Sequence, residues 1–413
     1  MIRPYRAIFI LLSLATWMLA ACGPVTMAQT ATPLPPTTAP KPAGVVTSPL
    51  DQYFVPPYYS ADYITIIEES KKEAGLVIYS VVPQKNWEPI IRAFNGHYPW
   101  VIVTTFELDS SGVFNHYYDA ANAGIRSADI AITSDQAGWQ AFFDKGEIFN
   151  YRSQEDLFVP EWSKSTIGIS KAHTGLYTTS IDPMLIIYNQ QMVTDSPSTL
   201  SAIATMSAAD PARYREQVTT VDADLDAAGY ATNWFWINRT GEAGWSDLNA
   251  IGSTKPILEP SSEAIVDAVG SGNMKVGYFA SALSVFQKLD DYPDLGWSYI
   301  TNGQPILLNS IAITRKAASP NSAKLMLDFI LSQDGQLAIA KGGLTPYRND
   351  IFGIPEHHIN TIAQTIGDEN LILFAMDERI MDMEKQKIFI ERWRTAMQKT
   401  SPPTPTPEAT PTP

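Results

Sequence analysis

The stretch LYTTSIDPMLIIYN, residues 176–189, is a long run of β-branched, aromatic and aliphatic residues. Such residues fit the pleated, half-buried surface of a sheet, and the run predicts one long strand. Shorter segments of strand and helix character alternate on both sides of it. This alternation predicts an α/β fold in which helices cover largely parallel sheets.

Three short strands are predicted before this stretch, namely GLVIYSV (75–81), VIVTTF (101–106) and DIAIT (129–133). A helix is expected between the first two, because Trp87, Ile90 and Phe94 recur on one helical face after Asn86, a suitable N-cap. A second amphipathic helix carries Phe114, Tyr117, Tyr118 and Ala121. The first third of the fold is therefore built from β–α units.

Further strands are predicted after the long stretch, at MKVGYF (274–279) and PILLNSIAIT (305–314). The segment SPNSAKLMLDFILSQDG then predicts a helix, with Ser319 as N-cap and Pro320 at its first position. Proline is favoured there because the amide that it lacks has no partner within the helix.

Length and composition restrict the kind of protein. The chain has 413 residues, 45% of them apolar, which is enough for two or three domains with packed cores. Its formal net charge is −14, and no block rich in Lys or Arg offsets it. Phosphate backbones would repel such a chain, so we expect no nucleic-acid partner.

The N-terminus has the pattern of a targeting segment. Arg3 and Arg6 precede an apolar run, residues 7–19, that is too short for a comfortable membrane span. The following LAACG (19–23) resembles a bacterial lipobox, which predicts a signal peptide over residues 1–22 and a lipid on Cys22. An ordinary signal peptide with a chance cysteine is the alternative. If Cys22 is acylated, no thiol is left for disulfides, zinc, iron–sulfur clusters or nucleophilic catalysis.

Two segments have a composition that cannot form a core. Residues 23–61 are rich in Pro, Thr and Ala and predict an extended linker that lifts the domain off the membrane. Residues 400–413 are similar and are predicted to be a disordered tail. The folded part is expected over residues 62–399.

Five segments together resemble one family, the extracellular solute-binding proteins of bacterial ABC importers, in the branch of ferric-iron, phosphonate and sugar-phosphate binders. They are EAGLVIYSVVPQKNWEPIIRAFNGHYPWVIV (73–103), AGIRSADIAITSDQAGWQAFFDKGEI (123–148), TGLYTTSIDPMLIIYNQQMV (174–193), EPSSEAIVDAVGSGNMKVGYF (259–279) and AASPNSAKLMLDFILSQDGQ (317–336). The resemblance covers roughly residues 68–350. It rests on the order and spacing of the segments.

The resemblance implies a two-lobed type II periplasmic-binding-protein fold with the ligand in a cleft between the lobes. Lobe 1 would comprise residues 62–181 with 311–350, and lobe 2 residues 182–310 with 351–399. It also implies a monomeric, extracytoplasmic receptor, anchored to a membrane through its lipid. Such a receptor binds a small molecule or ion, delivers it to ABC permease subunits, and has neither catalytic activity nor a cofactor.

In doubly wound sheets, ligands lie beyond the carboxyl ends of strands, beside helix N-termini. This rule selects polar positions that match the family's ligand loops, and the family comparison adds Asp224 and Asp226. Trp234 is a further candidate, because Trp234 and Trp236 would point to different faces of one helix, so that one of them could line the cleft. The predicted ligand-binding residues are Ser80, Lys85, Asp109, Ser110, Ser111, Ser134, Asp135, Asp182, Asp224, Asp226, Trp234, Ser261, Ser262 and Tyr278. A serine or aspartate before a helix is also an ordinary N-cap, and Trp234 could equally belong to the core.

Iron chemistry is not expected to carry over from the family. Ferric binders place two adjacent tyrosines where this chain has Ala282 and Leu283. The adjacent pair Tyr117–Tyr118 has the spacing of a helix that packs on a core. We therefore predict no metal site, and Lys85 is the only cation predicted near the cleft.

The stretch VDADLDAAGY (221–230) begins like a calcium loop, with aspartates at every second position. An EF-hand needs Gly at the sixth position and Glu at the twelfth, but counting from Asp222 these are Ala227 and Asn233. The alternatives are helix capping by Asp224 and Asp226, or a position in the cleft. In the cleft they would repel anions and favour a cationic or hydroxyl-rich ligand.

Two other classes of function remain open from the sequence. One is an anchored hydrolase, although the chain contains no H-E-x-x-H, G-x-S-x-G or P-loop motif. The other is a sensor or adhesive module that uses the same fold without transport, since a fold does not determine a function.

Overall fold

The structure is a computed structural model that describes residues 53, 55–164, 175–351, 353, 355–374 and 378–399. All of these belong to one compact unit, residues 48–413. The predicted signal peptide (1–22), its Cys22, most of the linker and the tail (400–413) lie outside the described residues. No helix in the described ranges combines the length and the apolar character that a membrane span requires.

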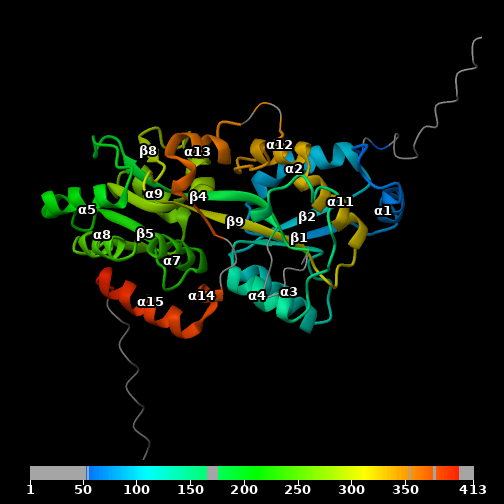
Figure 1. Ribbon diagram of the computed structural model, residues 1–413, viewed down its shortest axis with the longest axis horizontal. Coiled ribbons are helices and arrows are strands. Elements are labelled where there is room, and N and C mark those ends of the chain that lie inside the picture. Colours follow the sequence, from blue (N-terminus) through cyan, green and yellow to red (C-terminus); the bar gives the residue numbers. More distant parts are fainter. Residues whose placement is uncertain are drawn as a thin grey trace, which may run out of the picture. The chain divides into compact units, whose positions relative to one another are not determined.

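Two long antiparallel strands connect the two lobes. β4 (Tyr177–Asn189) is the predicted long strand, and it pairs with β9 (Gln304–Ile313) through Tyr177–Pro183. Every residue of both strands is buried. Figure 1 shows β4 and β9 running side by side from the sheet of one lobe to that of the other.

The sheet of the first lobe has the order β2-β1-β3-β9-β4. Its three short strands, all parallel to one another, correspond to the three predicted before the long strand: β1 (Leu76–Ser80), β2 (Val103–Glu107) and β3 (Ile130–Thr133). β3 then pairs antiparallel with β9. The sheet is therefore mixed, whereas alternation of strands and helices had predicted a largely parallel one. The two crossing strands are the reason.

The second lobe continues from β4 in the order β4-β7-β5-β6. β7 is antiparallel to β4, and β5 is parallel to both β7 and β6. These strands are β5 (Val218–Val221), β6 (Ile257–Glu259) and β7 (Val276–Ser281). Two more strands extend the pairing: β8 (Leu295–Ser298) on β4 and β10 (Leu371–Leu373) on β9.

Helices surround both sheets. Around the first lobe are α1 (Tyr63–Ser70), α2 (Gln84–His97), α3 (Gly112–Asn122), α4 (Gln136–Asp144), α11 (Pro320–Leu331) and α12 (Gln333–Lys341). Around the second are α5 (Leu200–Ala209), α6 (Pro211–Tyr214), α7 (Ala227–Thr240), α8 (Glu242–Gly252), α9 (Ser262–Gly270), α10 (Ala282–Phe286), α13 (Ile359–Ile366), α14 (Glu378–Met381) and α15 (Met383–Ala396). The two-lobed α/β fold predicted from the sequence is confirmed.

Two helix starts differ from the sequence predictions. α2 begins at Gln84, two residues before the predicted cap Asn86, whose amide instead donates to the Gly342 carbonyl at 2.6 Å. Ser319 does precede α11, but its hydroxyl donates to the Gly75 carbonyl and does not cap the helix. The first amides of α11 are satisfied by Glu73, which accepts from the backbone of Ser322 at 2.7 Å. In both helices, the side chain that local rules assign to capping instead donates a hydrogen bond to a carbonyl that is distant in the sequence.

A buried ion pair joins distant parts of the first lobe. The guanidinium of Arg348, 1% exposed, donates to the carboxylate of Glu155, which is fully buried. The hydroxyls of Tyr58 and Tyr59 donate to the same carboxylate at 2.9 and 2.8 Å. Arg348 also donates to the Leu331 carbonyl at 2.7 Å. The network fixes the first described residues and the segment after α12 to the same core.

We expect Arg348→Met to lower the free energy of unfolding by about 3–5 kcal/mol, because it leaves a buried carboxylate without its cation. Urea denaturation of the purified protein measures the change. Arg92→Met is the matched control, since its ion pair with Glu88 is exposed on both sides, at 74% and 71%. That variant should unfold like the wild type. Equal unfolding of all three proteins would contradict a stabilising role for the buried pair.

Candidate ligand-binding cleft

A cavity of about 700 Å³ lies at the carboxyl ends of strands from both sheets. The first lobe contributes residues that directly follow β1 or β3, together with the end of β2 and the loop after it. The second lobe contributes the ends of β5 and β7, the loop between β6 and α9, and the start of α7. The crossing strands β4 and β9 contribute Asp182 and Asn309. The site therefore lies where the strand-end rule places ligands.

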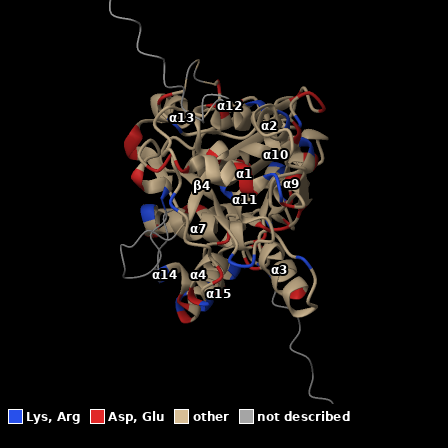
Figure 2. Ribbon diagram, turned by 90° about the vertical axis from the view of Figure 1, so that its right-hand side faces the viewer, with Lys and Arg blue, Asp and Glu red and all other residues tan. Residues whose placement is uncertain are grey.

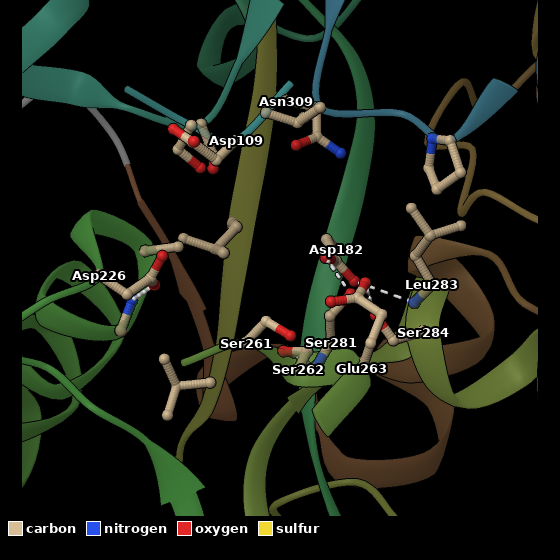
Figure 3. Close-up of a pocket in the computed structure, with 18 of the residues that line it drawn as sticks. Asp109, Asp182, Asp226, Ser261, Ser262, Glu263, Ser281, Leu283, Ser284 and Asn309 are labelled. Carbon is tan, nitrogen blue, oxygen red and sulfur yellow. Dashed lines mark hydrogen bonds between the residues drawn. The ribbon is translucent and has the colours of Figure 1, made fainter. Parts of the chain in front are cut away.

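Seven of the fourteen predicted ligand-binding residues line this cavity. They are Asp109, Ser110, Ser134, Asp182, Asp226, Ser261 and Ser262. Figure 3 shows five of them, with Asp109 and Asp226 to one side, Asp182 near the centre, and Ser261 and Ser262 below it.

The other seven do not line the cavity. In the first lobe, the hydroxyl of Ser80 accepts the backbone amide of Val82 at 2.9 Å. Lys85 is exposed on the first turn of α2, and Ser111 donates to Asp109 at 3.0 Å. Asp135 caps α4 by accepting the amide of Gly138 at 2.9 Å. These four side chains are used in turns and helix starts, the role that the capping interpretation assigns to such residues.

In the second lobe, Asp224, Trp234 and Tyr278 lie away from the cavity. Asp224 forms ion pairs with Arg394 at 2.6 Å and Lys399 at 2.8 Å. Trp234, 6% exposed, belongs to the hydrophobic core of this lobe. Tyr278 is fully buried in the same core, where it pairs with Ile186 of β4 before the register shift at Phe279.

The aspartates of the stretch VDADLDAAGY thus lie in two different environments. Asp224 lies in an ion-pair cluster with the C-terminal helix, and only Asp226 lines the cavity. Asp226 is also the N-cap of α7, because its Oδ1 accepts the amide of Gly229 at 2.6 Å. No group of three or more metal-ligating side chains occurs in the described ranges, so the comparison with a calcium loop gains no support.

Asp182 occupies the crossing strand and is 9% exposed. Its Oδ2 accepts the hydroxyl of Ser281 at 2.5 Å, and its Oδ1 accepts the amide of Leu283 at 3.3 Å. Burial raises the pKa of Asp182 to about 6, against the opposing effect of these hydrogen bonds. Repulsion from Glu263 raises it further.

Seven polar residues of the cavity are not among the predicted ligand-binding residues: Gln84, Glu107, Thr232, Glu263, Ser281, Ser284 and Asn309. Glu263 directly follows the predicted Ser262, and its carboxylate accepts the hydroxyl of Ser284 at 2.8 Å. Simple strand alternation could not have found Ser281, because the register of β7 on β4 shifts at Phe279. Ser281 therefore pairs with Met184, and Tyr278 pairs with Ile186 on the same face of β4. Asn309 could have been found by its pairing, since it lies opposite Ser180 near Asp182.

The charge of the lining has one sign. Glu107, Asp109, Asp182, Asp226 and Glu263 contribute carboxylates, and no Lys, Arg or His is among the described lining residues. Both charge signs are scattered over the face shown in Figure 2. No tyrosine is among the described lining residues.

Backbone strain occurs at the same place. Phe279 lines the cavity at the end of β7 and has a φ of 57°, a left-handed conformation that is costly for a residue with a side chain. Such conformations persist where the surrounding structure enforces them, and they are concentrated at functional sites. Phe279 lies two residues before Ser281, the last residue of β7, whose hydroxyl donates to Asp182.

Comparisons with known proteins establish the fold. No family model and no curated protein matches the sequence. Among solved structures, a substrate-binding protein of an ABC transporter from Agrobacterium tumefaciens is 19% identical, with a TM-score of 0.69 over 78% of this chain and 94% of that one. AfuA from Actinobacillus pleuropneumoniae, a periplasmic binding protein with fructose-6-phosphate bound, is 16% identical, with a TM-score of 0.63 over 79% and 99%.

PotD from Streptococcus pneumoniae, the substrate-binding protein of a spermidine/putrescine ABC transporter, is also similar. It is 13% identical, with a TM-score of 0.59 over 78% of this chain and 99% of that one. The fold of this chain is therefore that of the substrate-binding proteins of ABC transporters, as the resemblance in the sequence implied.

The buried Asp182 makes stability depend on pH in a predictable direction. Its pKa rises from 3.8 to about 6 on folding, so the folded state holds the proton more tightly between these values. The stability that this group contributes is present below about pH 4 and is lost as the pH rises through about 6. We expect Asp182→Asn to remove this loss, so that its free energy of unfolding relative to the wild type rises by roughly 2–3 kcal/mol from pH 4 to 7.

Urea denaturation at several pH values measures this difference. Asp290→Asn, which changes an exposed carboxylate outside the cavity, is the control and should follow the wild-type pH profile. Parallel profiles for Asp182→Asn and the wild type would show that Asp182 is not the titrating group.

Proposed function

We propose that this protein is an extracytoplasmic solute receptor, which captures a small ligand between its lobes and delivers it to the permease of an ABC importer. The observation that carries the proposal is the polar cavity at the crossing strands, lined from both lobes. The likeness in fold to three ABC-transporter substrate-binding proteins supports it. The receptor acts by binding and release, without catalysis or a cofactor.

The lobe boundaries belong to the same proposal. Lobe 1 comprises residues 62–181 with 311–350, and lobe 2 comprises residues 182–310 with 351–399. β4 exchanges its partner from β9 to β7 between Pro183 and Met184, which supports a boundary near residue 182. Closure of the lobes around a ligand would be a hinge motion about the crossing strands.

The proposed ligand contacts are the polar cavity residues of both lobes. From the first lobe come Glu107, Asp109, Ser110 and Ser134, and from the second come Asp226, Ser261, Ser262 and Glu263. Asp182 and Asn309 contribute from the crossing strands. A ligand bound to both sets would hold the lobes together, and the closed form is the one that we propose docks on the permease.

We expect a cognate ligand to raise the melting temperature of the full-length protein, because a ligand that binds only the folded state stabilises it by mass action. At a concentration of 100 Kd the gain is about 2.7 kcal/mol. Differential scanning fluorimetry against amines, sugars, sugar phosphates, phosphonates and metal ions measures it. A complete absence of shifts would contradict the receptor function.

A cavity-filling variant distinguishes binding in the cleft from binding elsewhere. Ala228 lines the cavity on the first turn of α7, and Ala228→Trp should abolish the shift without removing a polar group. Ala208→Trp on an exposed position of α5 is the matched control and should keep the shift. A shift that survives in Ala228→Trp would place the ligand outside this cleft.

The proposed membrane anchor is tested at Cys22, the only cysteine of the chain. We expect Cys22→Ser to abolish both the mass increment of a lipid and the cleavage before residue 22, because the cysteine that is lipidated also marks the cleavage site. Mass spectrometry of the purified wild type and variant measures both changes. A wild-type protein that carries no lipid on Cys22 would refute the lipid anchor.

A further inference from the structure

The charge of the cleft is not balanced by the protein. None of the five cavity carboxylates forms an ion pair with a described residue. In contrast, Asp222 and Asp224, which precede the cavity residue Asp226 in the sequence, form ion pairs with Lys399 at 2.7 and 2.8 Å. Aspartates just outside the cleft therefore have basic partners, whereas the carboxylates that line the cleft have none among the described residues.

Neutral donors hold these carboxylates in place and leave their charge intact. Asp109 accepts the amide of Gly112 at 2.6 Å, Asp226 accepts that of Gly229 at 2.6 Å, and Glu263 accepts the Ser284 hydroxyl. The pKa of Asp226 is raised by burial first and then by repulsion from Asp109 and Glu263, although its backbone hydrogen bonds oppose this. A bound cation would remove the repulsion.

The like charges come from opposite lobes. Asp109 follows β2 of the first lobe, and Asp226 precedes α7 of the second, yet Figure 3 shows both at the same side of the cavity. Closing the lobes brings these carboxylates nearer to each other, which is unfavourable in a partly desolvated cleft. A cation between them would attract both carboxylates and outweigh their mutual repulsion. Closure then depends on a positively charged ligand.

The arrangement fits an organic cation and not a metal ion. A metal needs several ligand atoms at one point, and no described group of three or more His, Cys, Asp or Glu residues is so placed. The carboxylates are instead divided, with Asp109 and Asp226 at one side of the cavity and Asp182 and Glu263 across from them. Leu108, Met184 and Leu307 add apolar surface to the lining.

An unused hydrogen-bond acceptor gives an independent indication of a ligand. Asn309 is 5% exposed and lines the cavity, into which it points in Figure 3. Its Nδ2 donates to Ser180 at 3.2 Å, whereas its Oδ1 has no hydrogen-bond partner among the described residues. This oxygen remains accessible from the cavity, and an ammonium group, which has only donors, can donate to it.

We propose that the cleft binds a linear organic dication, in which two ammonium groups are separated by an aliphatic spacer. One ammonium group contacts Asp109 and Asp226, and the other contacts Glu263 and Asp182. The inference rests on the proposed receptor function and names its class of ligand. A cavity of about 700 Å³ is large enough for such a molecule.

The test is isothermal titration calorimetry of the full-length protein with 1,4-diaminobutane and spermidine. Butylamine carries one charge, 1,4-butanediol carries none, and fructose-6-phosphate and calcium represent anions and metals. We expect the diamines to bind, butylamine to bind more weakly, and butanediol not to bind. Asp226→Asn keeps the cap of α7 because Asn is as good an N-cap as Asp. This variant should raise the Kd of the diamine roughly tenfold to hundredfold.

The matched control is Asp290→Asn, which removes the same charge outside the cavity and should leave the Kd unchanged. Equal melting temperatures of the two variants exclude misfolding as the cause of lost binding. If a sugar, an anion or calcium binds in a manner that Ala228→Trp abolishes, while the diamines do not bind, the cationic class is wrong and the receptor function stands. If none of these ligands binds and the wider screen also finds none, the receptor function fails with it.

Discussion

The antiparallel pairing of β4 with β9 is the constraint on which the rest of the structure depends. Each strand belongs to both lobes, and all of their residues are buried. Pro183 is the last residue of β4 that pairs with β9, after which Met184 pairs with β7. Proline has no amide to donate, so it suits the point at which one pairing ends and the next begins. The change of pairing partner along β4 thus coincides with a proline, which has no backbone amide for a further hydrogen bond between strands.

The same crossing generates the cleft and its chemistry. Strands whose carboxyl ends face each other from two sheets bring their following loops together, and the two crossing strands form one side of that space. Asp182 lies on β4, whose residues are all buried, so its burial follows from the fold. A carboxylate with a raised pKa and a strained Phe279 are both unfavourable for stability alone. Their presence at one cavity is what a binding site requires.

Sequence reasoning recovered the strands and the cleft because both follow from local pattern. Strand composition identified β1, β2, β3, β4, β7 and β9, and seven of the fourteen predicted ligand-binding residues line the cavity. It failed where the decisive partner is remote in the chain. Nothing local in the sequence separates Asp224 from Asp226, yet Arg394 and Lys399 bind only the first. Likewise Asn86 was read as a cap, although its partner is the carbonyl of Gly342.

Basic residues near the C-terminus confine the uncompensated negative charge to the cleft, although they do not line it. Within the acidic stretch the chain turns at Asp222, whose carbonyl accepts the amides of Leu225 and Asp226. This turn sends Asp222 and Asp224 toward Arg394 and Lys399, at the end of α15 and just after it, and leaves Asp226 to cap α7 at the cavity. Two of the three alternating aspartates are neutralised, so their field does not add to that of the cleft. The remaining carboxylate is held by backbone amides, which orient it without cancelling its charge. The net negative charge of the cleft therefore comes from its own carboxylates, because Arg394 and Lys399 neutralise only aspartates outside it.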